Sequence, residues 1–326
     1  MSGTRRVFMT GATGFIGRRV AARLADRGDR LVCLIRNRGR AGALEAAGAD
    51  LIEGDVADPA AVSRGVEGAD AAIHLAGLYD VGVVDRAAMR RTNVDGTRVF
   101  LEALARAGVA RAIHISSTAA LGPSKDGAGA VDVEWTGPYP SVYHATKAEA
   151  HRLARAARME VPGLMIVCPA FVFGPGDPGP GGRFIADLVH GRVPGLLTRP
   201  GWYSWVHVDD IAEGIVLALD RGTPGSIYAL TGEQASINDF AIRVSKLAGR
   251  RPPPLRMPAR LALGLGSVLD AVSRLTGARF TISRESVMTS AGLRWLHDAE
   301  STRRDLGWSA RPIDEVLAGV VEACRG

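Results

Sequence analysis

Apolar runs of a few residues alternate with longer amphipathic stretches along the first half of the chain. The runs are apolar at consecutive positions, which is typical of strands buried on both faces of a parallel sheet. They lie at Arg6–Thr10, Leu31–Ile35, Leu51–Glu53, Ala71–Leu75, Ala112–Ser116 and Leu164–Cys168. Between them, the spacing of apolar residues predicts helices at Phe15–Arg27, Asp85–Ala107 and Tyr143–Glu160. This alternation predicts an α/β fold with a doubly wound parallel sheet over residues 1–175.

The pattern changes after Pro169. The sequence GPGDPGPGG at Gly174–Gly182 contains too many glycines and prolines for a helix or strand, and it predicts a mobile loop over the substrate. We then expect strands at Ser204–Val208 and Ser226–Leu230, helices at Asp209–Asp220 and Ile237–Ala248, and, after Arg251–Pro258, a helical region that ends at Arg325. Residues 176–326 should form mainly a smaller α/β substrate lobe, while the strand and helix around 203–222 return to the sheet.

Composition narrows the class of protein. The chain has 326 residues, 47% of them hydrophobic, with 40 glycines and 17 prolines, so disordered and fibrous classes are excluded. The net charge is +6, but the arginines are scattered, so we expect no nucleic-acid partner. Three distant cysteines, Cys33, Cys168 and Cys324, build neither a disulfide framework nor a metal site, and no metal is expected. With no signal peptide or apolar stretch of ~20 residues, we expect a cytoplasmic location.

A glycine-rich turn, TGATGFIG at Thr10–Gly17, follows the first strand and opens the first helix. Gly11 allows a tight turn, Gly14 lets the backbone approach a pyrophosphate, and Gly17 lets the helix pack close to the strand. The helix N-terminus adds free N–H donors and a positive dipole. This context predicts a Rossmann-type dinucleotide site that also includes Thr13, Phe15 and Ile16.

The end of the second strand bears on the choice of cofactor. An acidic residue there would favour NAD, but the sequence has Arg36, whose guanidinium suits a 2′-phosphate. We therefore favour NADP(H) and keep NAD(H) as the alternative. Asp55 could accept a hydrogen bond from the adenine amine. Further cofactor contacts are expected after the third and fourth strands, at Val56, Leu75, Ala76 and Gly77.

Tyr143 and Lys147 are four residues apart at the start of a predicted helix, so their side chains share one face. A nearby ammonium, together with the positive nicotinamide of an oxidised cofactor, favours the phenolate and would lower the pKa of Tyr143 towards neutrality. Ser116 and Ser117 end the preceding strand at the ligand-binding edge of the sheet. Only one of them can face the site, and we favour Ser117 as the donor to a substrate carbonyl oxygen.

At these residues the chain resembles the extended short-chain dehydrogenase/reductase superfamily, the NAD(P)-dependent epimerase/dehydratase family. The resemblance rests on the glycine turn, HISSTAALG, YHATK, PAFVFGP and WVHVDD, and covers Arg6 to about Ala323. It implies a Ser117, Tyr143 and Lys147 triad. It also implies that Pro169, Ala170, Phe171 and Val172 line the nicotinamide, that Asn93 supports the site, and that long helices pair two chains into a homodimer.

The substrate class follows from what one segment lacks. Sugar-nucleotide enzymes of this superfamily usually carry an arginine and an asparagine near the strand that matches Val167–Gly174, and both are absent here. The segment instead resembles the dihydroflavonol reductase and 3β-hydroxysteroid dehydrogenase branches, and proteins labelled hopanoid-associated epimerases. This implies ketone and alcohol interconversion on a largely apolar small molecule or lipid. Expected substrate contacts are Ser117, Leu78, Phe173 and Trp202, with Phe171, Phe184 and Tyr203 as further apolar walls.

Three alternatives stay open at this point. The same triad would serve a sugar-nucleotide epimerase or dehydratase that retains its cofactor, and the same fold could belong to a non-enzymatic NADP-sensing subunit. Residues 257–275 predict a very apolar helix, which could make peripheral contact with a membrane or with a greasy substrate. We favour burial of this helix against its neighbours.

Overall fold

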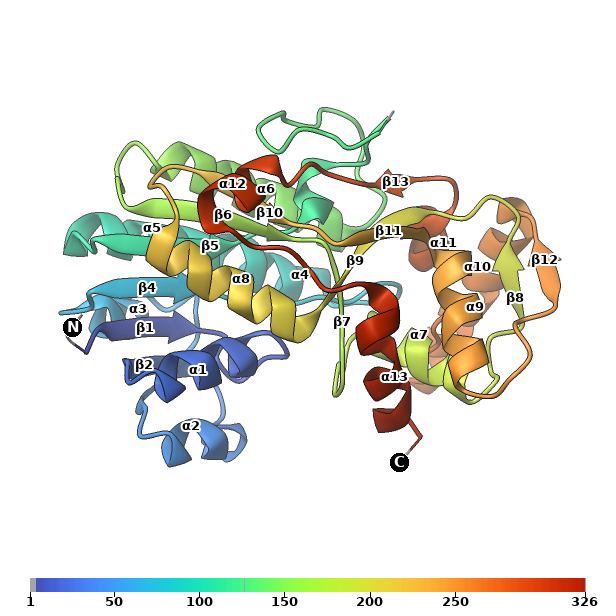
Figure 1. Cartoon of the computed structure of the whole chain (residues 1–326), viewed down its shortest axis with the longest axis horizontal. Helices are drawn as coiled ribbons and strands as arrows, with labels where there is room; N and C mark the ends of the chain where they lie inside the picture. The colour runs from blue at the N-terminus through green and yellow to red at the C-terminus, as the bar shows by residue number, and fades with distance from the viewer. Residues whose placement is uncertain (1–3, 126, 326) are drawn as a thin grey trace.

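The main sheet is parallel and doubly wound, as predicted (Figure 1). The computed structural model describes residues 4–125 and 127–325. Its seven-stranded sheet has the order β10-β6-β5-β4-β1-β2-β3. These strands are β1 (Arg6–Thr10), β2 (Arg30–Ile35), β3 (Asp50–Glu53), β4 (Ala71–His74), β5 (Arg111–Ile115), β6 (Leu164–Pro169) and β10 (Ile227–Leu230). The strand order reverses between β1 and β4, and open α/β sheets bind their ligands at the carboxyl ends of strands at such a point.

Helices cover both faces of this sheet and bury its apolar strands. One face carries α1 (Gly17–Asp26), α2 (Gly42–Ala46), α8 (Val208–Arg221) and α12 (Glu300–Leu306). The other face carries α3 (Pro59–Val66), α5 (Gly96–Ala107) and α6 (Val142–Ala157). The predicted helix Asp85–Ala107 consists of α4 (Arg86–Arg90), a π-helical turn (Arg91–Asp95) and α5. Short 3₁₀ helices lie at Arg38–Arg40 and Thr118–Leu121.

The second lobe is built around a smaller sheet in which β9 (Trp202–His207) pairs with β7 (Phe171–Phe173), β11 (Glu233–Ser236) and β13 (Arg294–Trp295). A two-stranded sheet joins β8 (Gly195–Leu197) to β12 (Leu255–Met257). The lobe's helices are α7 (Pro180–Val189), α9 (Ile237–Leu247), α10 (Ala259–Thr276), α11 (Arg284–Ser290) and α13 (Ile313–Ala323). Its core centres on Trp205, which stacks on Phe240 with ring centroids 3.7 Å apart.

The structure corrects three boundaries. The first helix begins at Gly17 rather than Phe15, so the glycine turn up to Ile16 lies outside it. Pro180 to Gly182 belong to the first turn of α7, because a proline at the start of a helix lacks only an N–H that would have no partner there. Besides the predicted return around 203–222, β10 and α12 also pack with the main sheet. The substrate lobe is therefore assembled from separate segments of 176–326.

The predicted helix in 257–275 forms as α10, but it is not buried on all sides. Leu261 and Leu275 are among its exposed side chains. The expectation of burial against neighbouring helices is therefore wrong for one of its faces.

Asp210 joins the two halves of the fold. Its carboxylate is buried at the start of α8 and accepts hydrogen bonds from the backbone N–H (3.1 Å) and Nε (2.7 Å) of Arg311. The Trp308 indole donates to the Asp210 carbonyl at 2.9 Å. These contacts hold the linker between α12 and α13 against the main sheet.

We expect Arg311→Met to lower the free energy of unfolding by about 2 kcal/mol, because the buried Asp210 carboxylate loses a charged donor that is itself half-exposed. Chemical denaturation measures this change. The exposed Arg64→Met is the matched control and should change stability by less than about 0.5 kcal/mol. Asp210→Asn in the Arg311→Met background should recover part of the loss. Equal stability of Arg311→Met and the control would show that the pair does not hold the linker.

Candidate active site

The predicted site residues meet at one edge of the main sheet. The glycine turn follows β1, Leu75 to Gly77 follow β4, Ser117 follows β5, and Pro169 ends β6. These strands are neighbours in the sheet and parallel, so their carboxyl ends lie side by side (Figure 1). Helix α6, which carries Tyr143 and Lys147, packs over the same region.

The glycine turn is shaped by close backbone approaches. Gly11 has φ +72°, and a Cβ atom there would lie 2.6 Å from the Ala76 amide nitrogen. A Cβ atom at Gly17 would collide with the Gly11 carbonyl, so the start of α1 can lie on the turn only as glycine. Gly14 is exposed and donates its N–H to the Gly11 carbonyl at 3.0 Å. Thr13, Phe15 and Ile16 are half-buried around it.

This turn fits the pyrophosphate of a dinucleotide. No side chain in the described part of the chain caps the N-terminus of α1, and its first turn has no acidic residue. Free N–H groups and the positive end of the helix dipole therefore face outwards beside the exposed Gly14. The residues present at the turn are those that a phosphate group requires.

Arg36 and Asp55, the residues expected to contact the adenosine, follow β2 and β3. Arg36 is exposed just after β2, and no carboxylate of the described residues pairs with it, whereas its neighbour Arg38 is paired with Glu45 at 2.8 Å. The Asp55 carboxylate accepts a hydrogen bond from the Ala57 N–H at 2.8 Å. The Val56 side chain is buried in the core, so only its backbone can face a ligand.

Ser117, Tyr143 and Lys147 lie together. The Ser117 hydroxyl accepts the Ala119 N–H at 3.1 Å and lies close enough to Tyr143 to lower the pKa of the phenol. Ser116 points to the other side of the strand, where its Oγ lies 2.8 Å from Nδ1 of His151. Lys147 is buried and donates from Nζ to the Ile115 carbonyl at 2.8 Å.

Burial controls the protonation of this group. Loss of water contact raises the pKa of Tyr143, and the hydrogen bond with Ser117 opposes part of that rise. Burial lowers the pKa of Lys147 to about 8. In the protein chain without cofactor, desolvation of the phenol therefore dominates the pKa of Tyr143. The expected lowering by Lys147 together with an oxidised nicotinamide stays a prediction.

Asn93 organises the loop after β4. It is buried in the π-helical turn, accepts the Leu78 N–H at 2.7 Å, and donates to the Leu78 carbonyl at 3.0 Å and to the Thr146 hydroxyl at 3.1 Å. Both amide hydrogens and the amide oxygen are therefore engaged. Asn93 ties the loop to α6 beside Lys147, and acts on the site by holding this loop.

Comparison with known proteins identifies the family. Residues 7–230 match the NAD dependent epimerase/dehydratase family. The chain belongs to this family. A sterol demethylase protein B of Methylococcus capsulatus is 31% identical over 309 residues, 92% of each chain. A putative dihydroflavonol 4-reductase of Synechocystis is 29% identical over 323 residues, 96% of this chain and 93% of that protein.

Solved structures agree on the fold. The crystal structure of gox2253 is 31% identical, with a TM-score of 0.82 over 99% of this chain and 98% of that one. A dTDP-glucose 4,6-dehydratase from Streptomyces venezuelae with bound NAD is 23% identical with a TM-score of 0.77, covering 98% and 97% of the chains. The expectation of an NAD(P)-dependent oxidoreductase of the extended short-chain type is confirmed at the level of family and enzyme class.

The predicted substrate contacts of this chain differ in their exposure to solvent. Phe173 is fully buried among Trp205, His207 and Phe240, so it is a core residue rather than a pocket wall. Trp202 is exposed and lies under the Arg294 guanidinium, 5.5 Å from its ring centroid. Leu78 and Phe171 are half-buried.

Tyr79 was missed by the sequence reasoning. It is exposed, and its ring centroid lies 4.7 Å from that of Tyr143. The available signal was its position directly after Leu78, in the loop that follows a central strand.

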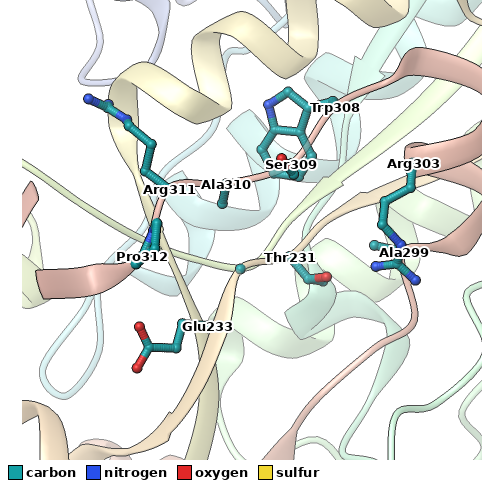
Figure 2. Close-up of a pocket in the computed structure, with 10 residues that line it drawn as sticks. Thr231, Glu233, Ala299, Arg303, Trp308, Ser309, Ala310, Arg311 and Pro312 are labelled. Carbon is teal, nitrogen blue, oxygen red and sulfur yellow. The ribbon is translucent and has the colours of Figure 1, made fainter. Parts of the chain in front are cut away.

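One cavity of about 310 Å³ lies at the end of β10 (Figure 2). None of the predicted catalytic, cofactor-binding or substrate-binding residues lines it. Its charged groups pair with their neighbours, Arg311 with Asp210, Arg303 with Asp298, and Glu233 with Arg243. The complete lining is Thr231, Gly232, Glu233, Ala299, Arg303, Trp308, Ser309, Ala310, Arg311 and Pro312. Because these charges are already compensated, we assign this cavity no catalytic part.

The lowered pKa of Lys147 predicts a dependence of stability on pH. Between about pH 8 and 10.5 Lys147 is neutral when folded and protonated when unfolded, so the unfolded chain binds more protons and stability rises with pH. The free energy of unfolding of the wild type should therefore gain up to about 3 kcal/mol over that of Lys147→Met across this range. Denaturation without cofactor measures this difference. For the exposed Lys246→Met, the difference in free energy of unfolding from the wild type should not change with pH. A difference that is also independent of pH for Lys147→Met would contradict burial of an ionisable amine.

Proposed function

We propose that the chain is an NADP(H)-dependent oxidoreductase that interconverts a ketone and a secondary alcohol on a largely apolar small molecule or lipid. The observation that carries this proposal is that Tyr143, one turn before buried Lys147 on α6, lies beside Ser117 at the carboxyl edge of the sheet, where Lys147 donates to the Ile115 carbonyl. Relatives support the reaction class. A protein of Stigmatella aurantiaca that is 29% identical is named a ketoreductase of a farnesylated dihydroquinoline oxide.

The raised pKa of Tyr143 suits a general acid in the reductive direction. The phenol keeps its proton at neutral pH and can pass it to a carbonyl oxygen, while Ser117 donates a hydrogen bond to the same oxygen. Lys147, with a pKa of about 8, is mostly protonated at neutral pH and stabilises the phenolate that forms. A bound nicotinamide supplies the hydride acceptor or donor. The glycine turn and Pro169 to Val172 would hold that cofactor.

We expect Tyr143→Phe to lower kcat by at least about a hundredfold, because the proton donor is lost, and to leave NADPH affinity nearly unchanged. Steady-state kinetics on a ketone panel and fluorescence titration of NADPH measure the two effects. Tyr139→Phe is the matched control, because it removes a phenol that donates to the Ala120 carbonyl at 3.1 Å outside the triad. Retention of more than a few per cent of turnover by Tyr143→Phe would remove this tyrosine from the mechanism.

Arg36 supports a preference for the phosphorylated cofactor. Its guanidinium is exposed beside the adenosine end of the glycine turn and is not held by a carboxylate of the described chain. A 2′-phosphate would provide a bidentate partner for this free group. NAD is present in the Streptomyces venezuelae structure, so NAD(H) stays the alternative.

We expect Arg36→Glu to raise the Kd for NADPH at least tenfold and to change the Kd for NADH less than about threefold, because only NADPH carries the 2′-phosphate. Calorimetric titration of both cofactors measures this. Arg106→Glu, an exposed residue near the end of α5, makes the same change in net charge as a control. An equal increase in Kd for NADPH and NADH would show that Arg36 does not bind the 2′-phosphate.

The apolar substrate class rests on Tyr79 beside Tyr143 and on the apolar residues predicted to line the substrate. Tyr79, Leu78 and Phe171 present aromatic and aliphatic surface, and residues 167–174 contain no arginine or asparagine to hold a sugar diphosphate. Consumption of NADPH in step with product separates this proposal from an epimerase, which consumes no cofactor. Cofactor binding without turnover on any substrate would favour a sensing subunit.

Other expectations are untested. None of the helices in the described residues is long and apolar enough to cross a membrane. The homodimer and the cytoplasmic location stay predictions.

A further inference from the structure

Helix α10 is anchored through one narrow face. Ala262, Gly266 and Asp270 follow each other at intervals of four residues and are buried. A Cβ atom at Gly266 would lie 2.6 Å from the Arg284 amide nitrogen, so α10 lies directly on the backbone that leads into α11. The Asp270 carboxylate accepts that same Arg284 N–H at 3.1 Å. This contact turns the remaining faces of the helix outwards.

The face opposite this anchor is apolar and exposed. Leu261, Val268 and Leu275 are 67%, 61% and 87% exposed. We call the exposed apolar set the outer stripe, consisting of Leu261, Gly264, Val268, Ala271, Val272 and Leu275. At about 100° per residue the outer stripe spans about 100° of the helix surface, the width that amphipathic helices normally bury. Such a continuous apolar surface indicates a binding partner.

The surroundings of the outer stripe are strongly basic. Residues 251–279 contain five arginines, all exposed, at positions 251, 256, 260, 274 and 279. The single acidic residue of this segment is the buried Asp270. Arg279 pairs with Asp80 at 3.2 Å, whereas the other four arginines pair with no carboxylate within residues 4–125 and 127–325. A second copy of this surface would bring like charges together, while an anionic surface would complement them.

The helix hairpin that carries this surface is attached to the active site. Glu285, at the start of α11, accepts the Gly82 N–H at 2.9 Å and the Val142 N–H at 3.2 Å. Val142 is the residue before Tyr143, and Gly82 lies in the loop that contains Tyr79. Glu285 therefore connects the hairpin that carries the outer stripe with the start of α6 and with the loop that contains Tyr79.

We propose that the outer stripe of α10 and its arginines bind an anionic phospholipid surface, with α10 lying in the plane of the lipid headgroups. Apolar side chains enter the acyl boundary and guanidinium groups bind the phosphates around them. This mode of binding goes beyond the reaction. Its consequence rests on the proposed function: an apolar substrate could pass from the membrane to Tyr143 with little exposure to water.

Co-sedimentation of the full chain with lipid vesicles tests this proposal. We expect binding to vesicles that contain phosphatidylglycerol, at least tenfold weaker binding to phosphatidylcholine alone, and loss of binding at high salt. Leu261→Asp with Val268→Asp should weaken binding at least tenfold. Arg260→Gln with Arg274→Gln should weaken it about tenfold or more, since each arginine contributes roughly fivefold. Met159→Asp, which changes an 89% exposed methionine outside α10, should leave binding unchanged.

The outcomes separate this proposal from its rivals and from the proposed function. Failure of the wild type to sediment with anionic vesicles would overturn it, as would equal binding to both kinds of vesicle or unchanged binding of the Leu261 and Val268 double variant. A dimer in sedimentation velocity that this variant dissociates, without vesicle binding, would identify a second copy as the partner. Tyr143→Phe should retain vesicle binding, and the α10 variants should retain turnover of a water-soluble ketone, so each proposal can fail alone.

Discussion

The hydrogen bond from the Lys147 ammonium to the Ile115 carbonyl fixes α6 against the end of β5, and the geometry of the site depends on it. An amine buried to this extent is costly, and the lowered pKa of Lys147 expresses that cost. The cost is tolerated because the ammonium has a hydrogen-bond acceptor, the Ile115 carbonyl. This carbonyl lies at the end of β5, where the sheet no longer uses the carbonyl groups of the strand. Tyr143, one turn earlier in α6, is thereby placed next to Ser117, two residues after Ile115.

The histidines around Lys147 are neutral, so Lys147 is the principal positive charge in this part of the interior. Burial lowers the pKa of His74 and His151 to about 3 and that of His114 well below its usual value, and Lys147 itself contributes to each shift. His74 lies between two hydroxyl groups, with Thr10 at 2.8 Å and Thr97 at 3.2 Å. Neutral histidines fill space behind the lysine without competing for the phenolate.

The parts of the site that could be predicted are those whose chemistry is local in sequence. The glycine turn, the four-residue spacing of Tyr143 and Lys147, and the alternation of Ser116 and Ser117 each depend on a single element and its period. Asn93 required knowledge of the family, because its role depends on a π-helical turn and on Leu78, which lies on another element. Phe173 was misassigned because alternation along β7 shows that two faces differ but not which of them meets the second lobe's core.

Helix α10 is a second element whose buried face could not be predicted from its own sequence. Its composition is apolar enough to suit a buried helix, and periodicity alone cannot say which of two apolar faces is covered. The covered face is set by Gly266, which allows the backbone at Ser283 and Arg284 to approach, and by Asp270, which accepts the Arg284 N–H. A larger residue at Gly266 would hold α10 away from α11 and leave Asp270 without this donor. The outer stripe is thus exposed as a consequence of how the opposite face packs, and the positive charge of the surrounding arginines disfavours contact between two copies of this face.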